Sequence, residues 1–235
     1  HQRDQWRHHD AAALAEQRER SRSHTRAGLT EANLATSRYG EILARTAPTE
    51  FLGYESTAAD GRVVAILRDG TEYDTLEAVP EVELRAEAAA RAEIVLDRTP
   101  FYAESGGQVA DTGLLLAPDG SPLFDVDDVQ RVAGTQTAGL TVHRGILHGA
   151  VRVGDVLRAE VDAERRAHTM RNHTGTHLLH RALRNVVGER ARQAGSLVTP
   201  DYLRFDFPFD RALTDDEKLA NEREVRRVVS EDREV

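Results

Sequence analysis

The feature that most limits the fold of this chain is an abrupt change of hydrophobic period near residue 163. Residues 51–160 hold short apolar runs separated by glycine turns, among them 63–67, 94–96, 114–116, 140–143 and 157–161. Short strands of this kind predict a small closed barrel, because closure removes exposed sheet edges. From residue 163 the apolar positions recur at helical spacing as far as Gly188, which predicts a long helix with a glycine C-cap.

Local signals extend this outline to the rest of the chain. Asp60-Gly61 and Pro118-Asp119-Gly120 are typical of turns. After the long helix, residues 196–198 and 202–207 read as two strands, and Thr214 opens a second helix over 213–229 with a capping-box sequence. Residues 11–22 predict a charged helix, and residues 81–92 a helical or disordered insert. The predicted fold class is α+β: a helical connector (1–47), a β-barrel (48–162) and an α+β domain (163–235).

Charge is distributed unevenly along the 235 residues, whose formal net charge is −9. Residues 50–128 carry 18 acidic and 5 basic side chains, whereas residues 165–192 carry 7 arginines and one glutamate. Clustered arginines bind a phosphate backbone favourably, so the net charge alone does not exclude a nucleic-acid partner. With no cysteine and no apolar run of about 20 residues, the chain lacks disulfides and a membrane span. We expect a soluble cytoplasmic protein.

The sharpest local pattern is a pair of histidines, His173 and His177, on the predicted long helix. Side chains four apart on a helix lie on one face, about 5–6 Å apart at Cβ, and two imidazoles so placed can bind one zinc ion. Equally, they can be two polar residues on a solvated face. Gly175 between them is costly inside a helix and indicates close approach by a substrate or another backbone. Thr174 stands where zinc proteases place their glutamate, so peptide hydrolysis by that mechanism is not expected.

Two further segments carry polar groups suited to a site. Gly106, Gly107 and Gln108 can present backbone and amide groups to an ester, or can simply form a tight turn within a barrel. The stretch from Arg192 to Val198 is a polar turn leading into a strand that could pack beside the histidine helix. Neither segment is decisive by itself.

Taken together, four segments resemble the alanyl-tRNA synthetase family and its free-standing AlaX-type relatives. They are TPFYAESGGQVADTG (99–113), RRAHTMRNHTGTHLLHRALRNVVG (165–188), RQAGSLV (192–198) and YLRFDF (202–207). The resemblance runs from about residue 48 to the end. Residues 1–30 also resemble the connector that leaves the family's aminoacylation region, through the run at residues 16–20. The resemblance implies an internal segment of an alanine–tRNA ligase whose ATP- and Mg²⁺-dependent domain is absent here.

What the resemblance implies for function is editing: hydrolysis of tRNA(Ala) mischarged with serine or glycine. His173 and His177 match the family's first two Zn²⁺ ligands, and the Cys-x-x-x-His pair that completes the site is not in this sequence. Gln193 matches an editing-pocket residue. Thr174 and Thr176 would orient the ester with it. The residues expected to bind substrate or tRNA are Gly106, Gly107, Gln108, Arg165, Arg166, Arg171 and Arg181.

Two other interpretations stay open at the level of sequence. The chain could be a free-standing AlaX-type deacylase, or a non-catalytic tRNA-binding module that uses the barrel and the basic helix as a docking surface. Neither a DNA nor a membrane partner is expected. A first residue that is His rather than Met favours an internal segment.

Overall fold

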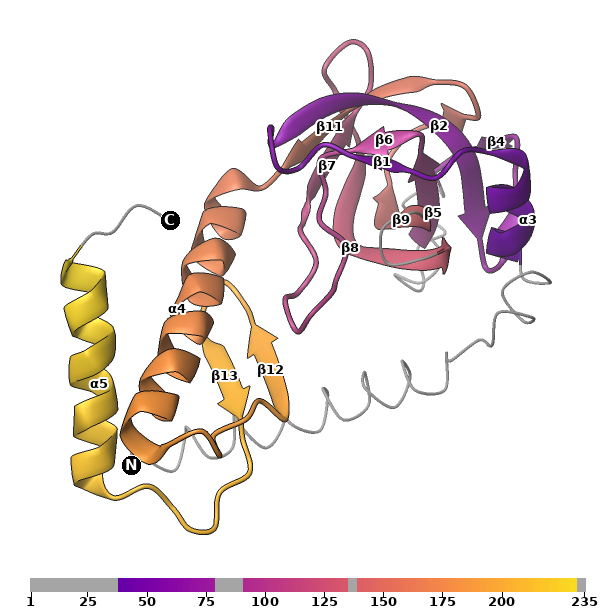
Figure 1. Ribbon diagram of the computed structural model, residues 1–235. Coiled ribbons are helices and arrows are strands. Elements are labelled where there is room, and N and C mark those ends of the chain that lie inside the picture. Colours follow the sequence, from indigo (N-terminus) through magenta and orange to yellow (C-terminus); the bar gives the residue numbers. More distant parts are fainter. Residues whose placement is uncertain (1–37, 79–90, 135–138, 232–235) are drawn as a thin grey trace, which may run out of the picture.

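The computed structural model describes residues 38–78, 91–134 and 139–231, which form a β-barrel joined to a helix–hairpin–helix unit (Figure 1). The barrel region contains α3 (Arg38–Arg45), β1 (Glu50–Phe51), β2 (Ala58–Arg68), β3 (Thr71–Glu72), β4 (Thr75–Leu76), β5 (Arg91–Leu96), β6 (Arg98–Thr99), β7 (Gly113–Leu116), β8 (Pro122–Gly134), β9 (Gly139–Leu147), β10 (Val151–Arg152) and β11 (Val156–Val161). The second unit contains α4 (Ala163–Val187), β12 (Gly195–Val198), β13 (Leu203–Asp206) and α5 (Asp215–Ser230).

Six antiparallel strands close the barrel in the order β11-β7-β8-β9-β5-β2, with β11 returning to pair with β2. The closing register places Ala159 opposite Ala59 and Leu157 opposite Gly61. A closed sheet satisfies the backbone groups of every strand and leaves no edge for another chain to pair with.

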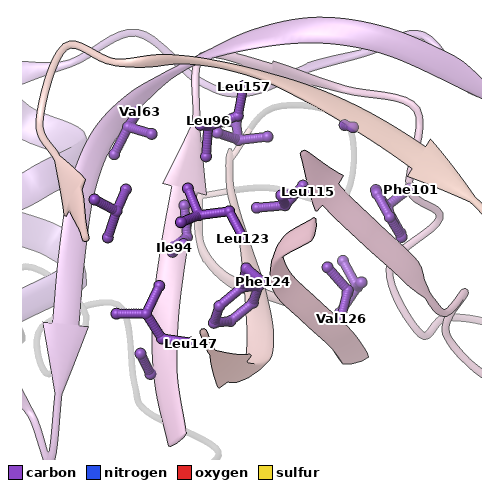
Figure 2. Close-up of a cluster of buried hydrophobic side chains, with 14 of the residues drawn as sticks. Val63, Ile94, Leu96, Phe101, Leu115, Leu123, Phe124, Val126, Leu147 and Leu157 are labelled. Atoms are coloured by element: carbon purple, nitrogen blue, oxygen red, sulfur yellow. The ribbon is translucent and has the colours of Figure 1, made fainter. Parts of the chain in front are cut away.

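Apolar side chains fill the barrel interior, as Figure 2 shows for Ile94, Phe101, Leu115 and Phe124, all of which are fully buried. A second cluster lies outside the wall, where Ile42 of α3 packs on Ala65, Leu67, Val95, Leu140 and Val142. The strands around α3 are therefore buried on both faces. This explains why they read as continuous apolar runs rather than as alternating ones.

One polar residue, His143 of β9, lies fully buried within this apolar wall. Its Nδ1 is 3.0 Å from the Ile94 carbonyl oxygen, which can only accept, so Nδ1 carries the proton. Its Nε2 then accepts from the Thr99 hydroxyl at 2.7 Å, and that hydroxyl oxygen accepts from the Phe101 N–H at 3.1 Å. Burial lowers the pKa of His143 to about 4. The neutral imidazole thus anchors the start of the loop from residue 100 to residue 112.

Helix α4 leaves the barrel directly after β11, and the β12–β13 hairpin and α5 lie on its two sides (Figure 1). The Asp162 side chain caps the helix by accepting from the Arg165 N–H at 2.9 Å. The Asn172 amide donates to the carbonyls of Thr199 and Pro200 at 2.8 and 3.1 Å, which ties the hairpin turn to the helix. The hairpin is therefore held in place against the histidine-bearing turns of α4.

The predicted barrel, long helix, two strands and second helix are confirmed, and the fold is mixed α+β. Gly188 has the positive φ expected of a C-cap, and Thr214 forms the capping box with Glu217. The prediction of a turn at Asp60-Gly61 is wrong, because both residues lie inside β2. A Cβ on Gly61 would approach the Arg98 carbonyl oxygen to 2.5 Å, so close strand packing requires this glycine. The helix predicted over 11–22 lies outside the described residues, as does the predicted insert up to residue 90.

Candidate functional site

The histidine pair lies midway along α4, with the rings of His173 and His177 stacked one turn apart. Their centroids are 5.0 Å apart and the ring planes are inclined by 38°. His173 is partly buried and His177 is exposed. Two effects lower the pKa of His173: the larger is desolvation by burial, and the smaller is the neighbouring His177. The His173 ring is therefore neutral at physiological pH. The helix therefore presents two adjacent imidazoles at the surface, one of which is fixed on its inner side.

The inner contact of His173 comes from the barrel. The Oε1 atom of Gln108 lies 2.6 Å from Nδ1 of His173, across 65 residues of sequence. Gln108 is 9 % exposed, so its amide is enclosed by protein. The glutamine of the barrel loop and the first histidine of the helix thus form one hydrogen-bonded unit, which the sequence segments did not indicate.

Backbone hydrogen bonds hold this barrel loop against β12. The Val198 N–H donates to the Gly107 carbonyl at 2.7 Å, and the Val109 N–H donates to the Val198 carbonyl at 3.0 Å. Gly107 has φ +84°, and a Cβ there would lie 2.5 Å from the Ser196 hydroxyl oxygen. The same hydroxyl accepts from the Gln193 amide at 2.9 Å. Contacts therefore run from Gln193 through Ser196 and the glycine turn to His173.

The two threonines flanking Gly175 have different environments. Thr174 is exposed beside the histidines, whereas Thr176 is 7 % exposed and its hydroxyl donates to the Asn172 carbonyl at 2.9 Å. The close approach that the sequence indicated at Gly175 comes from a side chain of the hairpin, since a Cβ there would lie 3.0 Å from Leu203 Cδ2. This glycine gives the hairpin room to pack on the helix.

Four arginines were predicted to bind substrate or tRNA, but one of them, Arg166, is buried rather than at the surface. It is 8 % exposed and forms a salt bridge with the buried Asp111. Its remaining donors reach the Pro100 and Gly53 carbonyls at 2.6 and 3.2 Å. Arg166 therefore fastens the first turns of α4 to the barrel loop and has no face toward solvent for a phosphate. A basic residue in a run of arginines gave no sign of this role.

The other three arginines remain accessible to different degrees. Arg165 is partly buried and donates to the Ala110 carbonyl at 2.9 Å, while Arg171 and Arg181 are exposed. The exposed pair lies on the turns before and after the histidines. Arg181 is four residues past His177 and so shares its face of α4, whereas Arg171 is exposed on another part of the helix surface.

The donor chemistry of the pair suits zinc, which binds neutral imidazole nitrogens. Within the described ranges, no group of three or more His, Asp or Glu side chains is arranged to hold a metal ion. The part of the chain described here would therefore supply two protein ligands, His173 and His177.

None of the helices in these ranges is long and apolar enough to cross a bilayer.

Sequence reasoning missed Asp111, which accepts from Arg166 and also from the Tyr102 N–H at 2.6 Å. The only sequence signal was a single carboxylate between Ala110 and Thr112 in an otherwise uncharged stretch. An isolated charge is rarely buried without a partner, but the sequence could not identify the partner 55 residues away.

Comparison with known families identifies the class of protein to which this chain belongs. The model of the tRNA synthetases class II (A) matches residues 6–165. The chain belongs to this family.

The similar proteins are alanine–tRNA ligases. The enzyme of Roseiflexus sp. (strain RS-1) is 49 % identical over 179 residues, which is 76 % of this chain and 18 % of that protein. The enzyme of Chloroflexus aurantiacus is 44 % identical over 227 residues, or 94 % of this chain and 22 % of that protein. The enzyme of Thermobifida fusca is 44 % identical over 204 residues, covering 86 % and 21 %. The chain thus spans about a fifth of the length of the relatives it matches.

Proposed function

We propose that this chain carries the editing site of an alanine–tRNA ligase and hydrolyses tRNA(Ala) mischarged with serine or glycine. The observation that carries the proposal is the 2.6 Å contact between Gln108 of the barrel and His173 of α4. It joins the two segments most typical of the family at one point beside the exposed His177. The similarity to alanine–tRNA ligases supports tRNA as the partner, and we propose the cytoplasm as the location.

In this proposal His173 and His177 hold a zinc ion, which when bound acts as a Lewis acid at the reacting centre. Water adds to the ester carbonyl, and the bond between the carbonyl carbon and the ribose oxygen breaks, releasing the amino acid and the tRNA. The exposed cations Arg171 and Arg181 would hold phosphates of the acceptor end. They contribute position rather than sequence specificity.

Selection of serine over alanine requires groups that recognise a hydroxyl. A site that hydrogen-bonds a hydroxyl rejects the analogue that lacks it, because its own polar groups are then left unpaired. Gln193 and Thr174 are exposed polar side chains, Thr174 next to His173 on α4 and Gln193 in the segment that leads into β12, whereas the Thr176 hydroxyl already donates within the helix. We assign seryl recognition to Gln193 and Thr174, and we give Thr176 a supporting part.

The test is hydrolysis of Ser-tRNA(Ala) by the polypeptide that naturally carries this chain, with zinc supplied. His173→Ala removes a metal ligand. We expect the rate of hydrolysis to fall by more than the ~10–100-fold that is typical when only the hydrogen-bond partner of a ligand is removed. His168→Ala removes an exposed histidine from the same helix and should leave the rate unchanged. A rate that His173→Ala does not alter contradicts the metal role. Tight binding of tRNA without any hydrolysis would favour the non-catalytic module.

A further inference from the structure

We propose that Gln108 is a positioning residue that fixes His173 in its Nδ1–H tautomer and leaves the lone pair on Nε2 free. The Oε1 atom of Gln108 lies 2.6 Å from Nδ1 of His173. A neutral imidazole has one donor and one acceptor nitrogen, and a glutamine oxygen can only accept. The proton of His173 must then lie on Nδ1. That a metal would use the Nε2 lone pair rests on the proposed function, whereas the tautomer does not.

Gln108 has little freedom to abandon this contact. Backbone hydrogen bonds to β12 bracket it on both sides, through the Gly107 carbonyl at 2.7 Å and the Val109 N–H at 3.0 Å. A further pair of backbone bonds to Ser105, at 3.0 and 3.2 Å, closes the turn. Because the backbone is already fixed, the contact with the histidine costs only the rotamer freedom of the glutamine side chain itself. The loop therefore holds the acceptor in place.

The helix that carries His173 is registered against the same loop by a second connection. Arg166, two turns earlier on α4, is bound to Asp111, three residues past Gln108. Both groups are almost fully buried. With the loop fastened to α4 at Arg166 and to β12 at Val198, the distance between Gln108 and His173 is set by the fold rather than by the side chains alone. The barrel thereby fixes the hydrogen-bond acceptor that faces the His173 imidazole.

The chain contains its own references for the tautomer. His143 must carry its proton on Nδ1, because that atom faces the Ile94 carbonyl oxygen at 3.0 Å. His168 is exposed on α4, and water leaves it free to exchange between tautomers. In a long-range ¹H–¹⁵N correlation spectrum of the metal-free, ¹⁵N-labelled chain at pH 8.5, where imidazoles are neutral, we expect His173 to match His143 and to differ from His168.

Two variants separate the proposal from a merely structural contact. Gln108→Glu keeps an oxygen acceptor and should preserve the Nδ1–H pattern of His173. Gln108→Leu removes the acceptor with little change of volume and should move His173 toward the mixed pattern of His168. In both spectra the His143 signals report whether the barrel is folded. If the Gln108 amide were turned so that its NH₂ group donates to His173, the wild-type imidazole would be protonated on Nε2. Observation of that tautomer overturns the proposal. So does an unchanged tautomer in a folded Gln108→Leu chain.

Zinc titration of the polypeptide that naturally carries this chain, against a competing chelator, distinguishes this inference from the proposed function. Removal of a ligand's hydrogen-bond partner lowers metal affinity by about 10–100-fold. That loss is expected for Gln108→Leu and not for Gln108→Glu. If that polypeptide binds no zinc while His173 is in the Nδ1–H form, the metal role fails and the tautomer assignment stands. If zinc binds equally well to the Gln108→Leu chain, the positioning role fails and the metal role stands.

Discussion

Acid should destabilise this protein through His143, well before its carboxylates are protonated. The imidazole lies fully buried in the barrel wall, and burial lowers its pKa from 6.5 to about 4. In the unfolded chain the ring regains its ordinary pKa. Between these two values the unfolded state binds a proton that the folded state does not, so stability falls as the pH falls from about 6.5 to about 4. Above and below this window His143 contributes no pH dependence.

The size of the effect follows from the two pKa values. Each pKa unit corresponds to about 1.4 kcal/mol, so the whole shift is worth about 3 kcal/mol at low pH. Between pH 7 and pH 5 the unfolded ring becomes almost fully charged while the folded ring stays neutral, which amounts to about 2 kcal/mol. For comparison, a typical domain has only about 5–15 kcal/mol of total stability.

Urea denaturation of the chain at pH 7 and pH 5 measures this difference directly. The matched variant is His143→Gln, which keeps a donor and an acceptor in the cavity but does not titrate. Other histidines contribute equally to both proteins, so the comparison isolates His143. We expect the wild type to lose about 2 kcal/mol more than the variant between the two pH values. Equal losses in the two proteins would refute the reasoning, because they would mean that the buried ring does not resist protonation.

One further prediction concerns the attachment of α4 to the barrel, and another concerns the packing of the barrel loop on β12. Asp111→Ala leaves a buried arginine without its counter-charge and should cost about 3–5 kcal/mol of unfolding free energy, measured by denaturant titration; a loss below 1 kcal/mol would show that solvent reaches the guanidinium. Gly107→Ala and Gly120→Ala form a matched pair, since both glycines have φ near +84° but only Gly107 has a neighbour, the Ser196 hydroxyl, within 4 Å of an added Cβ. Gly120→Ala should cost about 1–3 kcal/mol from backbone strain alone and Gly107→Ala clearly more, and equal melting temperatures would show that the turn moves freely away from β12.

Much of the local structure could be predicted because its causes lie within a few residues. Thr214 and Glu217 cap their own helix, and Gly188 takes the positive φ at the end of α4. The Asp60-Gly61 pair misled because a turn and a crowded strand both favour glycine. Only the Arg98 carbonyl, brought close by β6, distinguishes the two.

The candidate site was predictable in its parts but not in its assembly. The spacing of His173 and His177 fixes their common face, since both lie on one helix. The position of Gln108 in the sequence did not indicate whether its side chain contacts a substrate or a histidine. Arg166 looked like its neighbours in the basic run, yet its pairing with Asp111 removes it from the surface.

The sequence by itself determined the change from short strands to helix near residue 163, the caps, the basic segment and the histidine pair, because periodicity, capping and charge act over a turn or a strand. The tertiary structure decided which polar groups meet: Gln108 with His173, Asp111 with Arg166, and Thr99 with His143. These pairs lie 44 to 65 residues apart in the chain. Their contacts exist only because closure of the barrel and docking of the hairpin bring them together, and burial then obliges each polar group to find a partner.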